Sequence, residues 1–135
     1  MKIDGRCHCG AIVYVAEVDP ESASVCHCAD CQTFSGAPFR GSVPAKAEDF
    51  HITSGSPKIY VKTGDSGRRR AQGFCGDCGT PIYTSDAKDP KMFNLRLGAV
   101  KQREKIFPRR QIWTHSALRW ALDVKDLPAS PGEWA

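Results

Sequence analysis

The chain has 135 residues and a mass of 14.8 kDa, which is the size of one compact domain. Hydrophobic residues make up 41% and charged residues 25%, and the mean hydropathy is −0.40, so a disordered or fibrous chain is excluded. The formal net charge of +4 becomes nearly neutral if all seven cysteines are thiolates that hold two zinc ions, which argues against a nucleic-acid partner.

The sequence contains no apolar segment of the kind that directs a chain into a membrane or out of the cell. Its longest unbroken apolar run, Ala11 to Ala16, is far shorter than the ~20 residues of a membrane-spanning helix. Residues 1–6 carry no apolar core of a secretory signal. We therefore expect a cytoplasmic protein with no membrane partner, whose cysteines bind metal or act in catalysis rather than form disulfides.

Proline and glycine turns divide the chain into short segments rich in β-branched and aromatic residues, which is typical of a mainly β domain. One short helix is expected at about 29–35, ended by Gly36, and a further turn near 116–122. The last residues, Pro128 to Ala135, are expected to form a loose tail. The expected strands are 11–18, 39–43, 50–53, 58–62, 70–75, 81–84 and 92–97.

Two Cys-His-Cys triplets stand nineteen residues apart, the first beginning at Cys7 and the second at Cys26. Residues i and i+2 of a strand face the same side, so each triplet is expected to present two thiols to one metal ion. The same geometry turns His8 and His27 away, and it disfavours both histidines as ligands of that ion.

A third group, Cys75-Gly-Asp-Cys78 followed by Gly79, is typical of a zinc knuckle, in which two thiols reach one tetrahedral ion. A knuckle needs two further ligands, and spacing alone offers Cys28 and Cys31, which would complete a zinc ribbon. That pairing would leave three cysteines unused.

A second partition uses every cysteine. It combines a closed, structural site with an open, three-thiolate site where chemistry can occur. Zinc is favoured over an iron–sulfur cluster because neither set has the spacing of a cluster motif. The closed site would consist of Cys7, Cys9, Cys75 and Cys78, and the open site of Cys26, Cys28 and Cys31.

The sequence resembles the glutathione-dependent formaldehyde-activating enzyme (GFA) family, whose domain is shared with centromere protein V. The resemblance spans roughly residues 3–127 and implies an Mss4-like zinc-containing β fold, with a domain over 1–127 and a tail over 128–135. It rests on the cysteine groups within Gly5–Gly10, Cys26–Cys31 and Gly73–Thr80, and continues through Gln32–Pro38, Phe50–Gly55 and Tyr60.

The resemblance also implies the second partition, with two zinc ions per chain. One ion would be structural and the other catalytic, with Cys26, Cys28 and Cys31 as the catalytic residues. The implied reaction is that of a carbon–sulfur lyase, in which a glutathione thiol adds to formaldehyde to give S-hydroxymethylglutathione. The residues are compatible with this chemistry, because a zinc ion held by three thiolates is better suited to bind a soft thiolate than to activate water.

Two other classes of function are open. The centromere-protein branch of the domain suggests a zinc-stabilised binding module without turnover, whereas a nucleic-acid-binding zinc ribbon is disfavoured by the near-neutral charge. An anionic, glutathione-like thiol would need cations to meet its carboxylates. The candidates are Arg40, Arg68, Arg69, Arg70, Arg109 and Arg110, of which Arg40 lies nearest in sequence to the second cysteine group.

Side chains near the cysteines offer further, weaker candidates. Cys28 and Cys31 are expected at the N-terminal turn of the short helix, whose dipole would favour thiolates. Thr33 and Ser35 could donate hydrogen bonds to the product oxygen, although such residues more often serve turns and caps. The aromatic segment Trp113–Trp120 is expected to pack in the core rather than to line a pocket, and His115 within it is weighed as a proton shuttle against a surface histidine.

Overall fold

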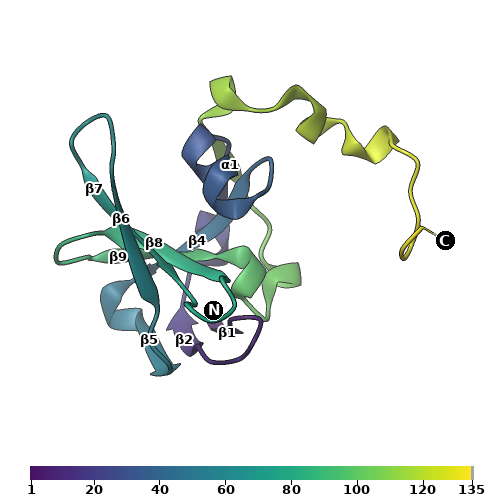
Figure 1. Cartoon of the computed structure of the whole chain (residues 1–135). Coiled ribbons are helices and arrows are strands. Elements are labelled where there is room, and N and C mark those ends of the chain that lie inside the picture. Colours follow the sequence, from purple (N-terminus) through teal and green to yellow (C-terminus); the bar gives the residue numbers. More distant parts are fainter. Residues whose placement is uncertain (135) are drawn as a thin grey trace.

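The computed structural model describes residues 1–134, which form two β-sheets, one α-helix and several 3₁₀ turns (Figure 1). The smaller sheet has the strand order β1 (Lys2–Arg6), β2 (Val13–Glu17), β5 (Phe50–Ser54) and is antiparallel. The larger sheet has the order β10 (Arg110–Ile112), β3 (Ser24–Cys26), β4 (Arg40–Lys46), β9 (Met92–Arg96), β8 (Pro81–Asp86), β7 (Arg69–Phe74), β6 (Lys58–Thr63). Its pairs are antiparallel except β10 with β3, which run parallel.

The helix α1 (Ala29–Ser35) connects β3 to β4 and has the expected bounds. It ends at Gly36, which takes the left-handed conformation with φ of +62° that a helix C-terminus favours. After β10 the chain leaves the sheets, runs past α1 and ends far from them (Figure 1). Within residues 1–134, no helix combines the length and apolar character needed to cross a membrane.

The 3₁₀ turns lie mostly in the last third of the chain. The turn expected near 116–122 is present as two short 3₁₀ segments, Thr114–Ser116 and Arg119–Leu122. Residues 128–134 form no helix or strand, and residue 135 of the expected tail lies outside the described residues. The remaining 3₁₀ segments are Pro20–Ser22, Ala47–Asp49, Leu97–Ala99, Arg103–Lys105 and Val124–Asp126.

The larger sheet has one apolar and one polar face, because apolar and polar residues alternate along its central strands. On β4, Val43 is fully buried in the core, whereas Arg40 and Ser42 point to the other side. On β9, Leu95 packs in the core and its neighbour Arg96 joins Arg40 and Ser42. The polar face therefore carries a row of charged and hydroxyl groups close to the N-terminal end of α1.

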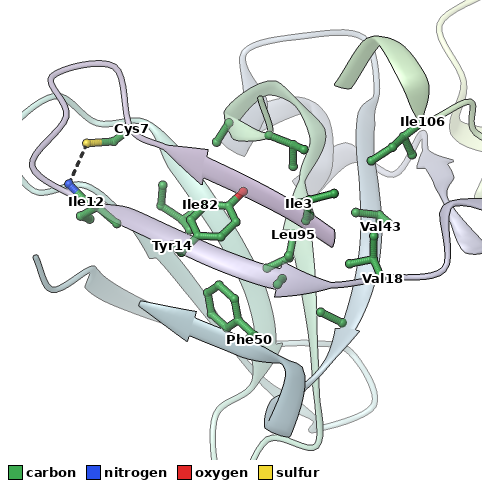
Figure 2. Packing of buried hydrophobic residues seen from close by; sticks show 14 of the residues in the cluster. Ile3, Cys7, Ile12, Tyr14, Val18, Val43, Phe50, Ile82, Leu95 and Ile106 are labelled. Carbon is green, nitrogen blue, oxygen red and sulfur yellow. Dashed lines mark hydrogen bonds between the residues drawn. The ribbon is translucent and has the colours of Figure 1, made fainter. Parts of the chain in front are cut away.

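The core lies between the two sheets (Figure 2). Ile3 and Tyr14 of the smaller sheet pack beside Ile82 and Leu95 of the larger one. Phe50 adds an aromatic cluster, with ring centroids 5.4 Å from Tyr14 and 5.0 Å from Phe93. Burial of these side chains supplies most of the hydrophobic stabilisation of so small a domain.

The mainly β fold class is confirmed, and each of the seven expected strands corresponds to an observed one. Three strands were not expected: β1, β3 and β10, which are short, polar, or both.

The inference that strand alternation presents the thiols of each Cys-His-Cys triplet is wrong. Cys7, His8 and Cys9 lie in a turn after β1, and only Cys26 of the second triplet belongs to a strand. The turn, not strand alternation, brings the thiols of the first triplet together.

Gly5→Ala is expected to destabilise the protein by about 3 kcal/mol, because the strand has no room for a methyl group. A Cβ at Gly5 would overlap the Tyr14 ring and stand 2.6 Å from the carbonyl oxygen of Ala99. Gly98→Ala is the matched control, since nothing lies within 4 Å of a Cβ there, and it should change stability by less than about 0.5 kcal/mol. Urea unfolding of both variants measures the difference, and equal stabilities would contradict the packing described here.

Candidate metal centres

The seven cysteines form two groups in which all sulfur atoms lie within 4.8 Å of one another. The four-cysteine group consists of Cys7, Cys9, Cys75 and Cys78, and the three-cysteine group of Cys26, Cys28 and Cys31. Both groups contain cysteine side chains alone among the described residues, so His8 and His27 belong to neither. The zinc-ribbon pairing of Cys28 and Cys31 with Cys75 and Cys78 is wrong, since the structure keeps these pairs in separate groups.

The four-cysteine group joins the turn after β1 to the turn between β7 and β8. Cys7 and Cys75 are buried, and Cys9 Sγ lies 3.6 Å from Cys7 Sγ and 3.8 Å from Cys75 Sγ. A tetrahedral ion with metal–sulfur bonds of about 2.3 Å separates its sulfur ligands by about 3.8 Å. The donor set and its spacing therefore fit a closed zinc site.

Backbone hydrogen bonds hold these two turns in shape. The Ile12 N–H donates to Cys7 Sγ at 3.2 Å, and this contact stabilises a thiolate. In the second turn, the Gly79 N–H donates to the Cys75 carbonyl at 2.8 Å, with Gly79 at a φ of +78°. The left-handed glycine lets the chain reverse between the two cysteines and the next strand.

Thr80 connects the two turns through its hydroxyl group. Its Oγ1 accepts the His8 N–H at 3.0 Å and lies 3.2 Å from Cys78 Sγ, to which the hydroxyl hydrogen can point. This hydrogen bond is the main cause that lowers the pKa of Cys78 to about 5. Thr80 thus favours the thiolate form of Cys78, which metal binding requires.

The three-cysteine group lies where β3 ends and α1 begins, on the polar side of the larger sheet. Cys26 ends β3, between Arg40 of β4 and Ile112 of β10. Cys28 is the N-cap of α1, and its sulfur accepts the Cys31 N–H at 3.3 Å. Burial opposes ionisation of Cys28, yet this N–H and the neighbouring thiols hold its pKa below the ordinary value. The expected placement at the helix N-terminus is confirmed.

A cavity of about 230 Å³ opens beside the three-cysteine group, and we refer to it as the small cavity. The three cysteines form one side, Ile112 and Trp113 another, and polar side chains of the larger sheet the rest. Those polar residues are Ser24, Arg40, Ser42, Lys62, Arg70, Gln72, Thr84, Asn94 and Arg96. An open group of three thiols therefore faces a strongly cationic space.

Arg40, Gln72 and Arg96 form a hydrogen-bonded cluster in the small cavity. Arg40 Nη1 and Arg96 Nη2 both donate to Gln72 Oε1, each at 3.3 Å, and Arg96 Nη1 donates to Ser42 Oγ at 2.7 Å. Arg96 is only 5% exposed, and burial, with the nearby charge of Arg40, lowers its pKa to about 8. Arg96 was not among the candidates from the sequence. In a strand whose residues alternate between apolar and polar, an arginine is expected to be exposed, and no local signal shows that this one is buried.

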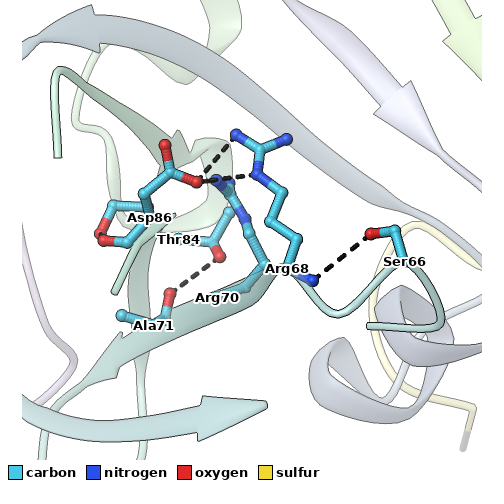
Figure 3. Close-up of polar contacts among 7 residues, drawn as sticks. Ser66, Arg68, Arg70, Ala71, Thr84 and Asp86 are labelled. Atoms are coloured by element: carbon cyan, nitrogen blue, oxygen red, sulfur yellow. Dashed lines mark hydrogen bonds and ion pairs between the residues drawn. The ribbon is translucent and has the colours of Figure 1, made fainter. Parts of the chain in front are cut away.

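The outer cations of the small cavity are paired with carboxylates. Arg68 and Arg70 both contact Asp86 Oδ1 at 2.8 Å (Figure 3), and Lys62 pairs with Asp30 of α1. These contacts lower the pKa of Asp86. Of the arginines proposed from the sequence, Arg40 and Arg70 line the small cavity, whereas Arg68, Arg69, Arg109 and Arg110 do not.

A comparison with known protein families shows which family has this chain as a member. Residues 2–116 match the family model described as glutathione-dependent formaldehyde-activating enzyme, which covers the whole of both cysteine groups. The chain belongs to the GFA family.

One curated protein is similar to this chain in sequence, and one solved structure is similar to it in fold. An uncharacterized lyase of Schizosaccharomyces pombe is 25% identical over 100 residues, which are 70% of this chain and 66% of that protein. The chain thus spans just under two thirds of that relative. A crystal structure of a Rhodobacter sphaeroides protein matches with a TM-score of 0.61 and 18% identity over 80% of this chain and 98% of the other, and this likeness concerns the fold alone.

The aromatic residues near the C-terminus do not pack as expected. Trp113 and Trp120 are 56% and 58% exposed, so the expectation of core packing is wrong for both. Trp113 instead takes a left-handed conformation, with φ of +58°, and lines the small cavity. His115 is exposed and does not line that cavity, which is the surface alternative. Thr33 is likewise exposed and outside the cavity, so the hydrogen bond expected from it to a product there has no support in the structure.

His27 and Ser35 have structural partners. The His27 ring is buried, lies 2.8 Å from Gln111 Oε1 through Nε2, and contacts the Phe39 ring. Ser35 donates to the Cys31 carbonyl at 2.6 Å at the end of α1, which is the expected helix-terminal role. Gln32 donates to the carbonyls of His27 and Ser116, and the second contact holds the 3₁₀ segment Thr114–Ser116 against α1.

Acidification is expected to release metal from the three-cysteine group before the four-cysteine group. Each group contains cysteines with a raised pKa and cysteines with a lowered one, so protons compete with a metal at both groups as the pH falls. The three-cysteine group has fewer protein ligands, so its metal is expected to leave first. The absorbance of a metal-sensitive chelating dye, followed during an acid titration, should show metal release in two steps, one for each cysteine group.

The variant Cys28→Ser is the control for this titration. It should lose the step at higher pH and keep the step at lower pH. A single step that releases all metal together, in both proteins, would contradict the difference between the two groups.

Proposed function

We propose that the protein is a zinc-dependent carbon–sulfur lyase that adds a small, glutathione-like thiol to an aldehyde such as formaldehyde, or catalyses the reverse reaction. The four-cysteine group would hold a structural zinc ion and the three-cysteine group a catalytic one. The observation that carries this proposal is the three-cysteine group itself, which supplies three soft ligands beside a small cationic cavity. Membership in the GFA family and the lyase-named relative support it.

Zinc held by three thiolates would take up a soft fourth ligand, and so favour the thiolate form of an incoming thiol at neutral pH. The chain's own residues favour the same form. The N–H of Cys31 and the guanidinium of Arg40 lie beside the sulfurs and stabilise negative charge there. Ile112 and Trp113 cover one side of the cavity and limit the access of water to the reacting atoms.

Ser42 is placed to assist the carbonyl oxygen of the aldehyde. Its Oγ accepts a hydrogen bond from Arg96, so its own hydroxyl hydrogen remains free to point into the small cavity. As the sulfur–carbon bond forms, the carbonyl oxygen gains negative charge, and a hydroxyl donor at that point stabilises the transition state. The oxygen then takes up the proton that the thiol has lost.

A second, larger cavity of about 810 Å³ shares Arg40 and Arg96 with the small one. It has its own cations, Arg6, Lys101 and Arg103, and is large enough for the body of a tripeptide thiol. The bulk of a glutathione-like molecule would lie there, with its carboxylates near these cations.

The proposal is tested by exchange spectroscopy on the zinc-loaded protein with glutathione and formaldehyde. We expect the protein to accelerate formation and breakdown of S-hydroxymethylglutathione above the spontaneous rate. Ser42→Ala should lower kcat by about tenfold, which corresponds to one lost hydrogen bond in the transition state. Ser54→Ala, an exposed serine on the other sheet, is the control.

Binding without turnover would be the contrary result. If the zinc-loaded protein does not accelerate the exchange, the enzyme proposal fails even where thiols bind. The non-catalytic binding module would then remain.

A further inference from the structure

Two arginines in the small cavity have no carboxylate partner among residues 1–134. Of its four cations, Lys62 pairs with Asp30 and Arg70 with Asp86. Arg40 and Arg96 take part in no ion pair within the described chain. Of these two, Arg96 of β9 is buried and Arg40 of β4 is half-buried.

The polar partners of these arginines do not balance their charge. Both guanidinium groups donate to the same amide oxygen of Gln72, which is neutral. Arg40 Nε is buried and has no hydrogen-bond partner in the described structure. Two adjacent cations, one buried and one half-buried, share a neutral acceptor here. This arrangement favours the approach of an anion that can accept the remaining N–H groups.

The charge of the three-cysteine group indicates how many anionic charges fit. Three thiolates with one divalent zinc ion carry a single negative charge, which compensates one of the two arginines. Before a thiolate binds as fourth ligand, one positive charge is therefore left, and a monocarboxylate would neutralise it. A carboxylate can also accept two parallel hydrogen bonds from the planar guanidinium group, in a bidentate pair.

Size and position favour the aldehyde as the source of that carboxylate. A cavity of about 230 Å³ lies below the ~300 Å³ at which pockets for drug-sized ligands begin, so it suits a small molecule. The larger cavity has Arg6, Lys101 and Arg103 for the carboxylates of a thiol. Arg40 and Arg96 line both cavities, and the three cations that only the larger cavity has leave these two available for the smaller reactant.

We propose that Arg40 and Arg96, held by Gln72, bind the carboxylate of a small aldehyde acid of the glyoxylate type beside the three-cysteine group. This inference rests on the proposed function and defines its second substrate. The thiol sulfur bonds to the aldehyde carbon, the carbonyl electron pair moves to oxygen, and this oxygen takes the thiol proton. The product is a 2-hydroxy-2-thio carboxylate, and no oxidant or reductant is needed.

Binding is measured by calorimetry on the zinc-loaded protein, without any thiol. The probes are acetate and glycolate, and their uncharged counterparts are acetamide and glycolaldehyde. We expect each carboxylate to bind at least about tenfold more tightly than its counterpart, and added salt to weaken the carboxylates alone. Equal affinities within each pair would overturn the inference.

Two substitutions locate the binding. Arg40→Gln should weaken acetate binding at least about tenfold. Arg69→Gln changes an exposed arginine of β7 that takes part in no ion pair among residues 1–134, and it should leave acetate binding unchanged. Zinc content is measured for each variant, so that loss of metal is not mistaken for loss of the carboxylate site. Acetate that binds directly to zinc would survive Arg40→Gln, and that result would overturn the inference.

Gln72→Glu supplies an independent test that does not depend on ligand binding. The new carboxylate would stand where Gln72 Oε1 now accepts from both arginines, so it should raise the unfolding temperature and abolish acetate binding. A lower unfolding temperature, with acetate binding retained, would contradict the charge balance proposed here.

The outcomes separate this inference from the proposed function. Carboxylate binding without any acceleration of thiol addition would remove the lyase proposal but leave the carboxylate site in place. Thiol addition to formaldehyde, with no preference for glyoxylate and no acetate binding, would support the lyase and overturn the carboxylate site.

Discussion

Replacement of Cys75 by serine is expected to leave most of the chain unfolded at 25 °C. Cys75 is buried, and its group joins two turns that lie 66 residues apart between Cys9 and Cys75. Metal binding at a structural zinc site contributes about 10–16 kcal/mol, which matches or exceeds the net stability of a typical domain. A protein of this size has little other stabilisation to offset such a loss.

Near-ultraviolet circular dichroism and the dispersion of amide NMR signals measure this effect. Cys28→Ser is the matched control, since it removes a sulfur from the three-cysteine group, and it should remain folded with native dispersion. If Cys28→Ser is as unfolded as Cys75→Ser, the assignment of a structural role to one group alone is wrong.

Cys31→Ser is expected to lower kcat/KM for thiol addition at least about 10³-fold, which corresponds to about 4 kcal/mol. Cys31 is the most deeply buried of the three cysteines, and its N–H also donates to Cys28 Sγ. Loss of its thiolate would leave two ligands, too few to hold a metal in a defined geometry. Absorption of the cobalt-substituted protein, before and after a thiol is added, reports the same site without turnover.

Thr33→Ala is the control for this loss, because Thr33 lies exposed on the same helix. It should retain both the activity and the change in cobalt absorption. Full activity in Cys31→Ser would contradict a catalytic role for the three-cysteine group.

Local signals were sufficient for much of the fold and for the cysteine groups. Gly36 marked the end of α1, and β-branched segments marked the central strands. The partition that gives every one of the seven cysteines a place in a metal site matches the two groups that the structure forms. These features depend on residues near one another in sequence, or on a fixed number of ligands per ion.

Other features depend on contacts that a sequence does not display. The strand β10 contains Arg110, Gln111 and Ile112, all exposed, and exists because β3 offers a free edge for parallel pairing. Arg96 is buried because β4 places Ser42 opposite it. Trp113 was expected in the core, since large aromatic residues usually are, but the chain leaves the sheet at that residue.

The parallel pairing of β10 with β3 also determines when the small cavity can form during protein synthesis. All residues of the four-cysteine group have been made once the ribosome passes residue 78, well before Arg110–Ile112 emerge. Throughout that interval, Ile112 and Trp113 do not yet cover one side of the three-cysteine group. The nascent chain therefore offers a metal ion an open route to these sulfurs, which the finished fold narrows.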